Sequence, residues 1–160
     1  MMDIVNQIKE LDNVKVTVQR ENRIFVDVDK DRVIGTLYSL KLMGFHQLSV
    51  QNAVDWIKEG EFEVFYVLYS HQYKVNVIVR TRVDRDNPIM ETAEKIYPSA
   101  HTWEREITEM FGIKFKGNDE SGKPFILENW KEIPPLRKDF DSVKYCNEHF
   151  VFRHSEEGNE

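Results

Sequence analysis

Cysteine is almost absent from this chain, because Cys146 is the only one among 160 residues. One thiol forms no internal disulfide, which favours a protein of a reducing compartment. An iron–sulfur cluster is held by several cysteine thiolates, so a cluster bound by this chain alone is excluded. Glycine and proline are scarce too, with 7 and 5 residues, which excludes low-complexity and collagen-like chains. The glycines are scattered singly and form no phosphate- or dinucleotide-binding motif, which argues against NADH or ATP binding.

Long hydrophobic runs and an excess of positive charge are missing as well. The longest apolar run is residues 64–69, whereas a membrane-spanning helix needs about 20 residues. Lys and Arg number 22 against 28 Asp and Glu, and the net charge of -6 argues against nucleic acid as a partner. The start, residues 1–6, carries an acid where a signal peptide has basic residues, so we expect no signal peptide. Any association with a membrane is therefore expected to be indirect.

What is present is enough apolar material for one globular domain. The hydrophobic content is 41% and the aromatic content 12%, and domains commonly run to about 100–200 residues. No internal repeat and no linker rich in Pro, Gly or Ser divides the chain. We therefore expect one domain over residues 1–140, followed by a C-terminal tail over residues 141–160 that is partly mobile.

Hydrophobic periodicity predicts the secondary structure of the first half. The predicted elements are a helix over 3–11, a strand pair over 14–18 and 24–28, a helix from Asp29 or Asp31 to Met43, a second strand pair over 48–56 and 62–68, a strand over 75–79, and a short helix from Asn87 to Ile96. Residues 65, 67 and 69 are apolar as well, which predicts that the strand over 62–68 is covered on both faces. The fold class is α+β, a mainly antiparallel sheet of about five strands with helices packed on it.

The segment from Tyr97 to Gly117 predicts an amphipathic helix followed by a strand. Ser99 is placed to cap the helix and Gly112 to end it. An apolar stripe is formed by Trp103, Ile107, Met110 and Phe111. The rest of the helix surface is formed by Glu104, Arg105, Glu106, Thr108 and Glu109. By itself this pattern is typical of a helix that packs on a sheet.

The sequence of this segment resembles the signature of a known family. Tyr97-Pro98 is followed by Trp103-Glu-Arg-Glu, then by Met110-Phe-Gly-Ile and Phe115-x-Gly, and further on by Pro135-Leu-Arg-Lys-Asp-Phe. In this order the motifs resemble the 30 kDa subunit family of NADH:quinone oxidoreductase (respiratory complex I), over roughly residues 48–140. The loop over 117–124 departs from the family, being one residue longer and lacking its paired arginines. The short chain is more similar to the corresponding subunit of energy-converting, membrane-bound nickel–iron hydrogenases.

The resemblance implies an accessory, structural subunit of the peripheral electron-transfer arm of a complex I-related oxidoreductase. The parent complex would be an NADH or F420H2:quinone-type dehydrogenase, or a membrane-bound hydrogenase. The chain itself would hold no cofactor and perform no catalysis, and would dock on the large catalytic subunit and on the small iron–sulfur subunit. Iron–sulfur clusters and nickel–iron would belong to those partners. The location would be cytoplasmic, on the inner face of the membrane, through the complex.

Eight side chains are candidates for the partner interface, four on the predicted helix and four beyond it. They are Glu104, Arg105, Glu106, Glu109, Trp130, Arg137, Lys138 and Asp139. For the charged ones, pairing within the domain is the alternative, and it includes a buried Arg–carboxylate pair near Pro134-Pro135. For Trp130 the alternative is core packing.

Two other functions stay open on the residues alone: an independent small α+β enzyme acting on a soluble substrate, and a free-standing adaptor. No catalytic spacing is recognised, and Asp55 is interpreted as a surface residue at a strand end. Cys146, His149 and His154 approach the spacing of metal ligands, but a zinc site usually needs four ordered ligands, and we expect no metal site.

Overall fold

The computed structural model describes residues 2–150. The elements are α1 (Met2–Lys9), β1 (Val14–Arg20), β2 (Arg23–Val28), the short 3-10 helix η1 (Lys30–Arg32), α2 (Val33–Leu42), β3 (Gln47–Trp56), β4 (Glu61–Ser70), β5 (Val75–Asp84), β6 (Ile89–Glu91), α3 (Ala100–Phe111), β7 (Lys114–Lys116) and α4 (Ser142–His149). Within this part of the chain, no helix is long and apolar enough to cross a bilayer.

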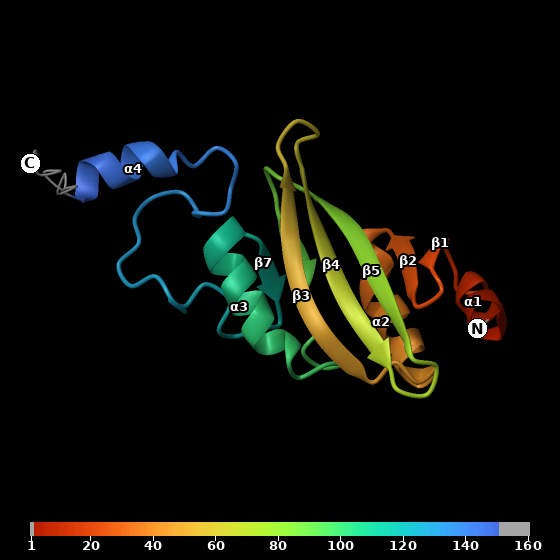
Figure 1. The fold of residues 1–160 in the computed structure, drawn as a ribbon. Coiled ribbons are helices and arrows are strands. Elements are labelled where there is room, and N and C mark those ends of the chain that lie inside the picture. The colour runs from red at the N-terminus through yellow and green to blue at the C-terminus, as the bar shows by residue number, and fades with distance from the viewer. Residues whose placement is uncertain (1, 151–160) are drawn as a thin grey trace, which may run out of the picture.

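The main sheet has five strands in the order β1-β2-β5-β4-β3 (Figure 1). Both predicted strand pairs are confirmed, because β1 with β2 and β3 with β4 are antiparallel neighbours. β5 continues to Asp84, five residues further than predicted, and pairs with β2 in the parallel direction. The predicted α+β class with a mainly antiparallel sheet is therefore confirmed, with one parallel pair in its middle.

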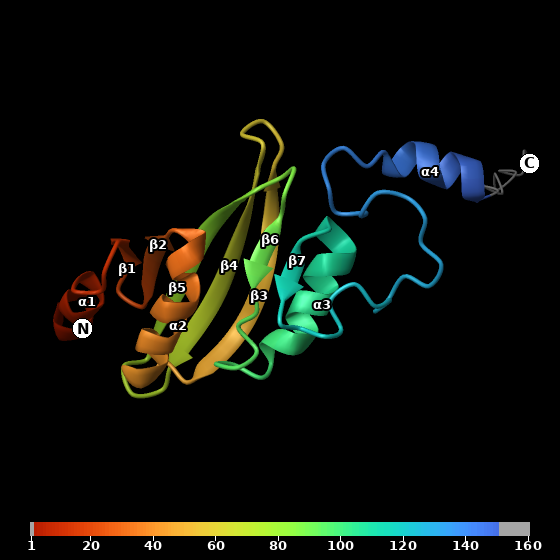
Figure 2. The same cartoon turned by 180° about the vertical axis from the view of Figure 1, so that it is seen from behind.

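The helices cover a single face of this sheet. Figure 2 shows α2 and β6 in front of the strands and α3 beside the edge strand β3, whereas Figure 1 shows the strands uncovered. On the covered face Phe62, Val64, Tyr66 and Leu68 are fully buried, as the alternation of β4 predicted. The intervening residues of β4 are only half-buried, so the prediction that β4 is covered on both faces is wrong for the described chain.

The short helix predicted over residues 87–96 is also wrong. The segment forms β6, which pairs in parallel with β7, and Lys114 N–H donates to the Pro88 carbonyl at 2.8 Å. At the other end Thr92 N–H donates to the Lys116 carbonyl at 2.9 Å. Asn87-Pro88 is a local signal for a helix start, but these main-chain bonds to a distant strand decide the conformation.

α4 lies inside the segment predicted as a tail. Its N-terminus is capped, because the Asp141 carboxylate accepts a hydrogen bond from Lys144 N–H at 2.9 Å. Residues 151–160 of the predicted tail, including His154, lie outside the described residues. Figures 1 and 2 show that α4 and the loop before it lie beside α3, away from α1. We call residues 123–150 the C-terminal arm.

Candidate partner-binding site

α3 carries the signature motif and ends as predicted. Gly112 has φ of 82°, a left-handed conformation that costs little only for glycine, and its N–H donates to the Thr108 carbonyl at 2.9 Å. The predicted Ser99 cap is wrong, because its side chain makes no capping hydrogen bond and its backbone is already helical. The chain enters α3 through a turn in which Ala100 N–H donates to the Tyr97 carbonyl at 2.8 Å.

Glu104 does not lie on the surface of α3, and this predicted position is wrong. Glu104 is 0% exposed, because the buried stripe of α3 is Ala100, Glu104, Ile107 and Phe111. Ile107 and Phe111 of the predicted stripe are confirmed, whereas Trp103 and Met110 are only partly buried against the core. The carboxylate accepts hydrogen bonds from the Thr92 hydroxyl at 2.6 Å, Ala93 N–H at 2.8 Å and the Asn118 amide at 3.0 Å. Burial raises the pKa of Glu104, although these donors oppose the shift. Glu104 therefore joins α3 to the ends of β6 and β7 from inside.

Glu109 and Arg105, one turn apart on α3, hold the start of the C-terminal arm. The Glu109 carboxylate accepts three main-chain N–H bonds, from Phe125 at 2.8 Å, Ile126 at 2.9 Å and Leu127 at 3.1 Å. Burial acts to raise its pKa, but the three N–H groups outweigh burial, so the pKa of Glu109 is lowered. Arg105 donates to the Pro124 carbonyl at 3.1 Å and pairs with Glu120 at 2.9 Å.

A second anchor of the arm lies at the end of the sheet, around Asp55. Arg85 donates to both Asp55 oxygens, at 3.0 and 3.3 Å, and also contacts Asp139 at 2.7 Å. The second Asp55 oxygen accepts Lys138 N–H at 2.8 Å, and Arg137 pairs with Asp139 at 3.2 Å. Hydrogen bonding to Asp55 raises the pKa of Arg85. The Pro135–Phe140 motif is thus fastened to the strands by a network of charges.

The interpretation of Asp55 as a surface residue is wrong, and the sequence reasoning missed its role with Arg85. The Asp55 side chain is 1% exposed and that of Arg85 13% exposed. A signal for this burial exists in the sequence, because residues 51, 53 and 55 occupy one face of β3, opposite the apolar row of β4. Asp55 lies across from Phe62, which is fully buried. A buried Arg–carboxylate pair was one of the predicted alternatives and is present, but the sequence did not identify Arg85 and Asp55 as its two residues.

Trp130 packs within the arm itself. Its ring lies 5.5 Å from Phe140 and 5.0 Å from Tyr145, and its indole N–H donates to the Ile133 carbonyl at 3.0 Å. Tyr145 also stacks on His149 at 4.2 Å. This aromatic cluster joins α4 to the loop before it.

The eight predicted interface residues thus fall into two groups. Glu104, Arg105, Glu109, Trp130, Arg137 and Asp139 make the contacts within the chain given above. The side chains of Glu106 and Lys138 make no ion pair or hydrogen bond to any described residue. Contact of these residues with a partner stays a prediction, from which Glu104 is removed because of its burial.

The arm also presents apolar side chains to solvent. The exposed ones are Ile126, Ile133, Leu136, Val143 and Phe150, with exposed fractions from 42% to 69%. Side chains of this kind, set on a segment that is fastened at two places, are typical of a protein–protein interface. Among residues 2–150, no group of three or more His, Cys, Asp or Glu side chains is arranged to hold a metal ion.

Residues 26–146 match the profile of the family described as "Respiratory-chain NADH dehydrogenase, 30 Kd subunit". The C subunit of the F(420)H(2) dehydrogenase of Methanosarcina mazei is 33% identical over 124 residues, which cover 74% of this chain and 75% of that protein. The C/D protein of NADH-quinone oxidoreductase from a Hydrogenobaculum species is 34% identical over 122 residues, 75% of this chain but only 21% of that longer protein.

Solved structures agree with these relatives. A chain in the structure of the membrane-bound sulfane sulfur reductase, an archaeal respiratory membrane complex, superimposes with a TM-score of 0.87 at 32% identity, covering 99% of this chain and 98% of that one. A trypsin-resistant fragment of Nqo5 shares the fold, with a TM-score of 0.63 at 23% identity over 73% of this chain and 96% of the fragment. The motifs, the fold and these matches together show that the chain belongs to the 30 Kd subunit family of respiratory-chain NADH dehydrogenase, whose members are components of complex I-related oxidoreductases.

Proposed function

We propose that this chain is a cofactor-free, structural subunit of the peripheral arm of a membrane-bound, complex I-related oxidoreductase. It docks on the large catalytic subunit and on the small iron–sulfur subunit, and so reaches the inner face of the membrane through them. The observation that carries the proposal is the C-terminal arm, which is fastened by Glu109 and Asp55 and exposes apolar side chains.

The relatives support the kind of assembly. One is named as a C/D protein, in which the region like this chain is part of a longer polypeptide, and this fusion supports the D component as a large neighbour. Another lies in an archaeal respiratory membrane complex. The sites for the electron donor and acceptor belong to the neighbouring subunits. The parent complex is a dehydrogenase, a reductase or a hydrogenase of this architecture, and those subunits decide which.

The anchoring network supports the arm as the docking surface. The anchors at Glu109 and Asp55 restrict the chain and remove charged groups from water, and both effects cost free energy. In return they fix the position of segments that carry the exposed side chains of Leu136 and Val143. A rigid surface binds with a smaller entropy loss than a flexible one. The arm is therefore held ready for a partner rather than ordered by it.

The proposal is tested by co-purification from cells that produce the whole complex. Leu136 and Val143 are 52% and 69% exposed, so Leu136→Asp and Val143→Asp are expected to leave the melting temperature of the isolated chain nearly unchanged. When this chain carries an affinity tag and is purified from such cells, the two variants are expected to retain less of the large subunit than the wild type does. The matched control is Leu42→Asp on α2, which is 71% exposed and outside the arm. Equal retention of the large subunit by arm and control variants would contradict the proposal.

The absence of chemistry in the chain is tested separately. The isolated protein is expected to contain no flavin, iron or nickel by absorbance and metal analysis, and to sustain no electron transfer. A stoichiometric cofactor in the isolated chain would contradict this part of the proposal.

A further inference from the structure

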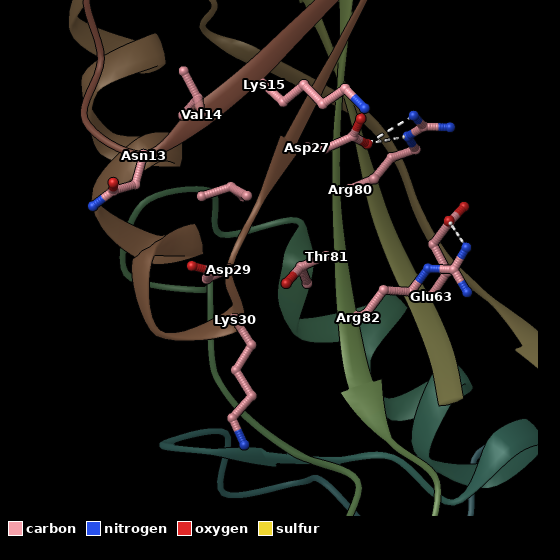
Figure 3. Close-up of a pocket in the computed structure, with 11 residues that line it drawn as sticks. Asn13, Val14, Lys15, Asp27, Asp29, Lys30, Glu63, Arg80, Thr81 and Arg82 are labelled. Atoms are coloured by element: carbon pink, nitrogen blue, oxygen red, sulfur yellow. Dashed lines mark hydrogen bonds and ion pairs between the residues drawn. The ribbon is translucent and has the colours of Figure 1, made fainter. Parts of the chain in front are cut away.

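A hollow of about 670 Å³ opens in the part of the molecule that lies away from the C-terminal arm. Its walls are the start of β1, the end of β2 with the first residue of η1, the middle of β5, and Glu63 of β4 (Figure 3). Its volume is within the range of ligand-binding clefts. None of its lining residues belongs to α3 or to the arm, so it is separate from the docking surface proposed above.

The hollow exists because β2 leaves the sheet before β5 ends. The parallel ladder between them stops at Asp27 and Arg80, whereas β5 runs on to Asp84. Asn76 N–H donates to the Asn22 carbonyl on the β2 side, and the peptide groups of every second residue in a strand point to the same side. The main-chain groups of Arg82 therefore face the side on which β5 has lost its neighbour. This is an open strand edge of the kind that pairs with another extended chain.

A buried hydroxyl lines the same hollow. Thr81 is 2% exposed, and its Oγ1 has no hydrogen-bond partner among the described residues. Buried hydroxyls are nearly always hydrogen-bonded, and an unmade bond destabilises the fold. Thr81 is therefore placed to bond a group that enters the hollow from outside the chain.

The charges of the lining leave a positive excess. Arg80 is paired with Asp27 at 2.7 Å and Arg82 with Glu63 at 2.9 Å, and Figure 3 shows both pairs. Two further basic side chains of the lining, those of Lys15 and Lys30, form no ion pair with any described carboxylate, and neither does the acidic Asp29 with any described cation. Two unpaired cations against one unpaired anion favour an acidic occupant.

We propose that this hollow is a second docking site, in which an extended acidic segment of a neighbouring subunit adds to the open edge of β5. Such a segment offers both N–H and C=O groups to the main chain of Arg82, accepts a bond from Thr81, and places carboxylates near Lys15 and Lys30. A small anion would bond only to the hydrogen-bond donors of the hollow and would be repelled by the carboxylate of Asp29. The open strand edge offers both donors and acceptors, which favours a peptide. The inference rests on the proposed role as a subunit, and it makes the chain a bridge between two neighbours.

The test uses the intact complex and a zero-length carbodiimide crosslinker, which joins lysine amines to carboxylates in contact. Lys15 and Lys30 are expected to crosslink to one acidic segment of another subunit. Thr81→Val keeps the shape of the side chain and removes the hydroxyl, so the isolated chain is expected to melt at the same or a higher temperature. In the complex the same variant is expected to lower the crosslink yield by about fivefold, as the loss of one hydrogen bond predicts. Thr17→Val, at an exposed threonine of β1, is the control and is expected to change neither quantity.

Three outcomes would overturn the inference: no crosslink from either lysine to another chain, a crosslink only to a second copy of this chain, or equal yields with Thr81→Val and Thr17→Val. Competition of the crosslink by inorganic phosphate but not by a synthetic peptide of the crosslinked segment would also overturn it, because the site would then take a small anion. If the arm variants release the chain while Thr81→Val has no effect, only this inference fails. If the arm variants leave the complex intact, the proposed function fails instead.

Discussion

Replacing Asp55 by asparagine tests whether the charge network at the end of the sheet fixes the C-terminal arm. The change removes one negative charge from a side chain that is 1% exposed and leaves Arg85, 13% exposed, with Asp139 alone. An asparagine in the same place retains one oxygen, so only one of the two acceptors of Arg85 and Lys138 N–H remains.

The expected loss follows from this geometry. Removing one partner of a buried ion pair costs about 3–5 kcal/mol. Because Arg85 keeps its contact with Asp139 at 2.7 Å and the asparagine keeps one acceptor, we expect a loss of about 2–3 kcal/mol. For a domain of this size about 2–4 °C correspond to each kcal/mol, so the melting temperature is expected to fall by about 4–12 °C.

Asp27 provides the matched control, because it pairs with Arg80 at 2.7 Å on the open face of the sheet. Its side chain is 36% exposed, and exposed pairs are worth about 0–1 kcal/mol. Asp27→Asn is therefore expected to lower the melting temperature by about 0–4 °C.

Thermal unfolding followed by circular dichroism measures the global effect, and limited trypsin digestion at Lys131 and Lys138 measures the local one. Asp55→Asn is expected to speed cleavage at both sites below the melting temperature, because Lys138 N–H loses its carboxylate acceptor. Equal melting temperatures for the two variants, or an unchanged rate of cleavage in Asp55→Asn, would show that the arm is held by other contacts.

Further predictions concern α3 and its surroundings. Glu109→Gln leaves at least one of three main-chain N–H donors without its carboxylate and is expected to cost about 1–3 kcal/mol in urea unfolding, whereas Glu106→Gln is expected to be neutral; equal effects would contradict the assignment. Hydrogen bonds to Glu94 and Glu120 raise the pKa of His101, so its stabilising contribution is fully present below about pH 6.5, the usual histidine value, and is lost as the pH rises through the raised folded pKa. The difference in melting temperature between the wild type and His101→Ala should accordingly shrink as the pH rises above about 6.5 and through the raised pKa of His101, and a difference that grows with pH would contradict the prediction. Gly117→Ala is expected to lower stability by about 1–3 kcal/mol, because φ is +92° and a Cβ would lie 2.9 Å from a Thr92 methyl carbon; an unchanged melting temperature would disprove the contact.

The family and most of the strands could be predicted from the sequence. The alternation of apolar and polar residues in β4 and β5 indicates which side chains share a face of the sheet. Because it depends only on neighbours along the chain, it can be recognised without knowledge of the fold. The end of α3 is equally local, because a glycine is needed where the backbone turns left-handed. The motifs between Tyr97 and Phe140 predicted the family that the comparisons then showed.

The roles of the motif's polar residues required the tertiary structure. Glu104 sits on a helix whose other side chains suggest an exposed position, and it is buried because Thr92, Ala93 and Asn118 meet it from other segments. The same holds for Asp55, which bonds the main chain of Lys138 across 83 residues of sequence. Periodicity shows which way a side chain points relative to its own strand or helix. What it meets there depends on how distant segments pack, and for a buried carboxylate that packing decides whether the charge is tolerated.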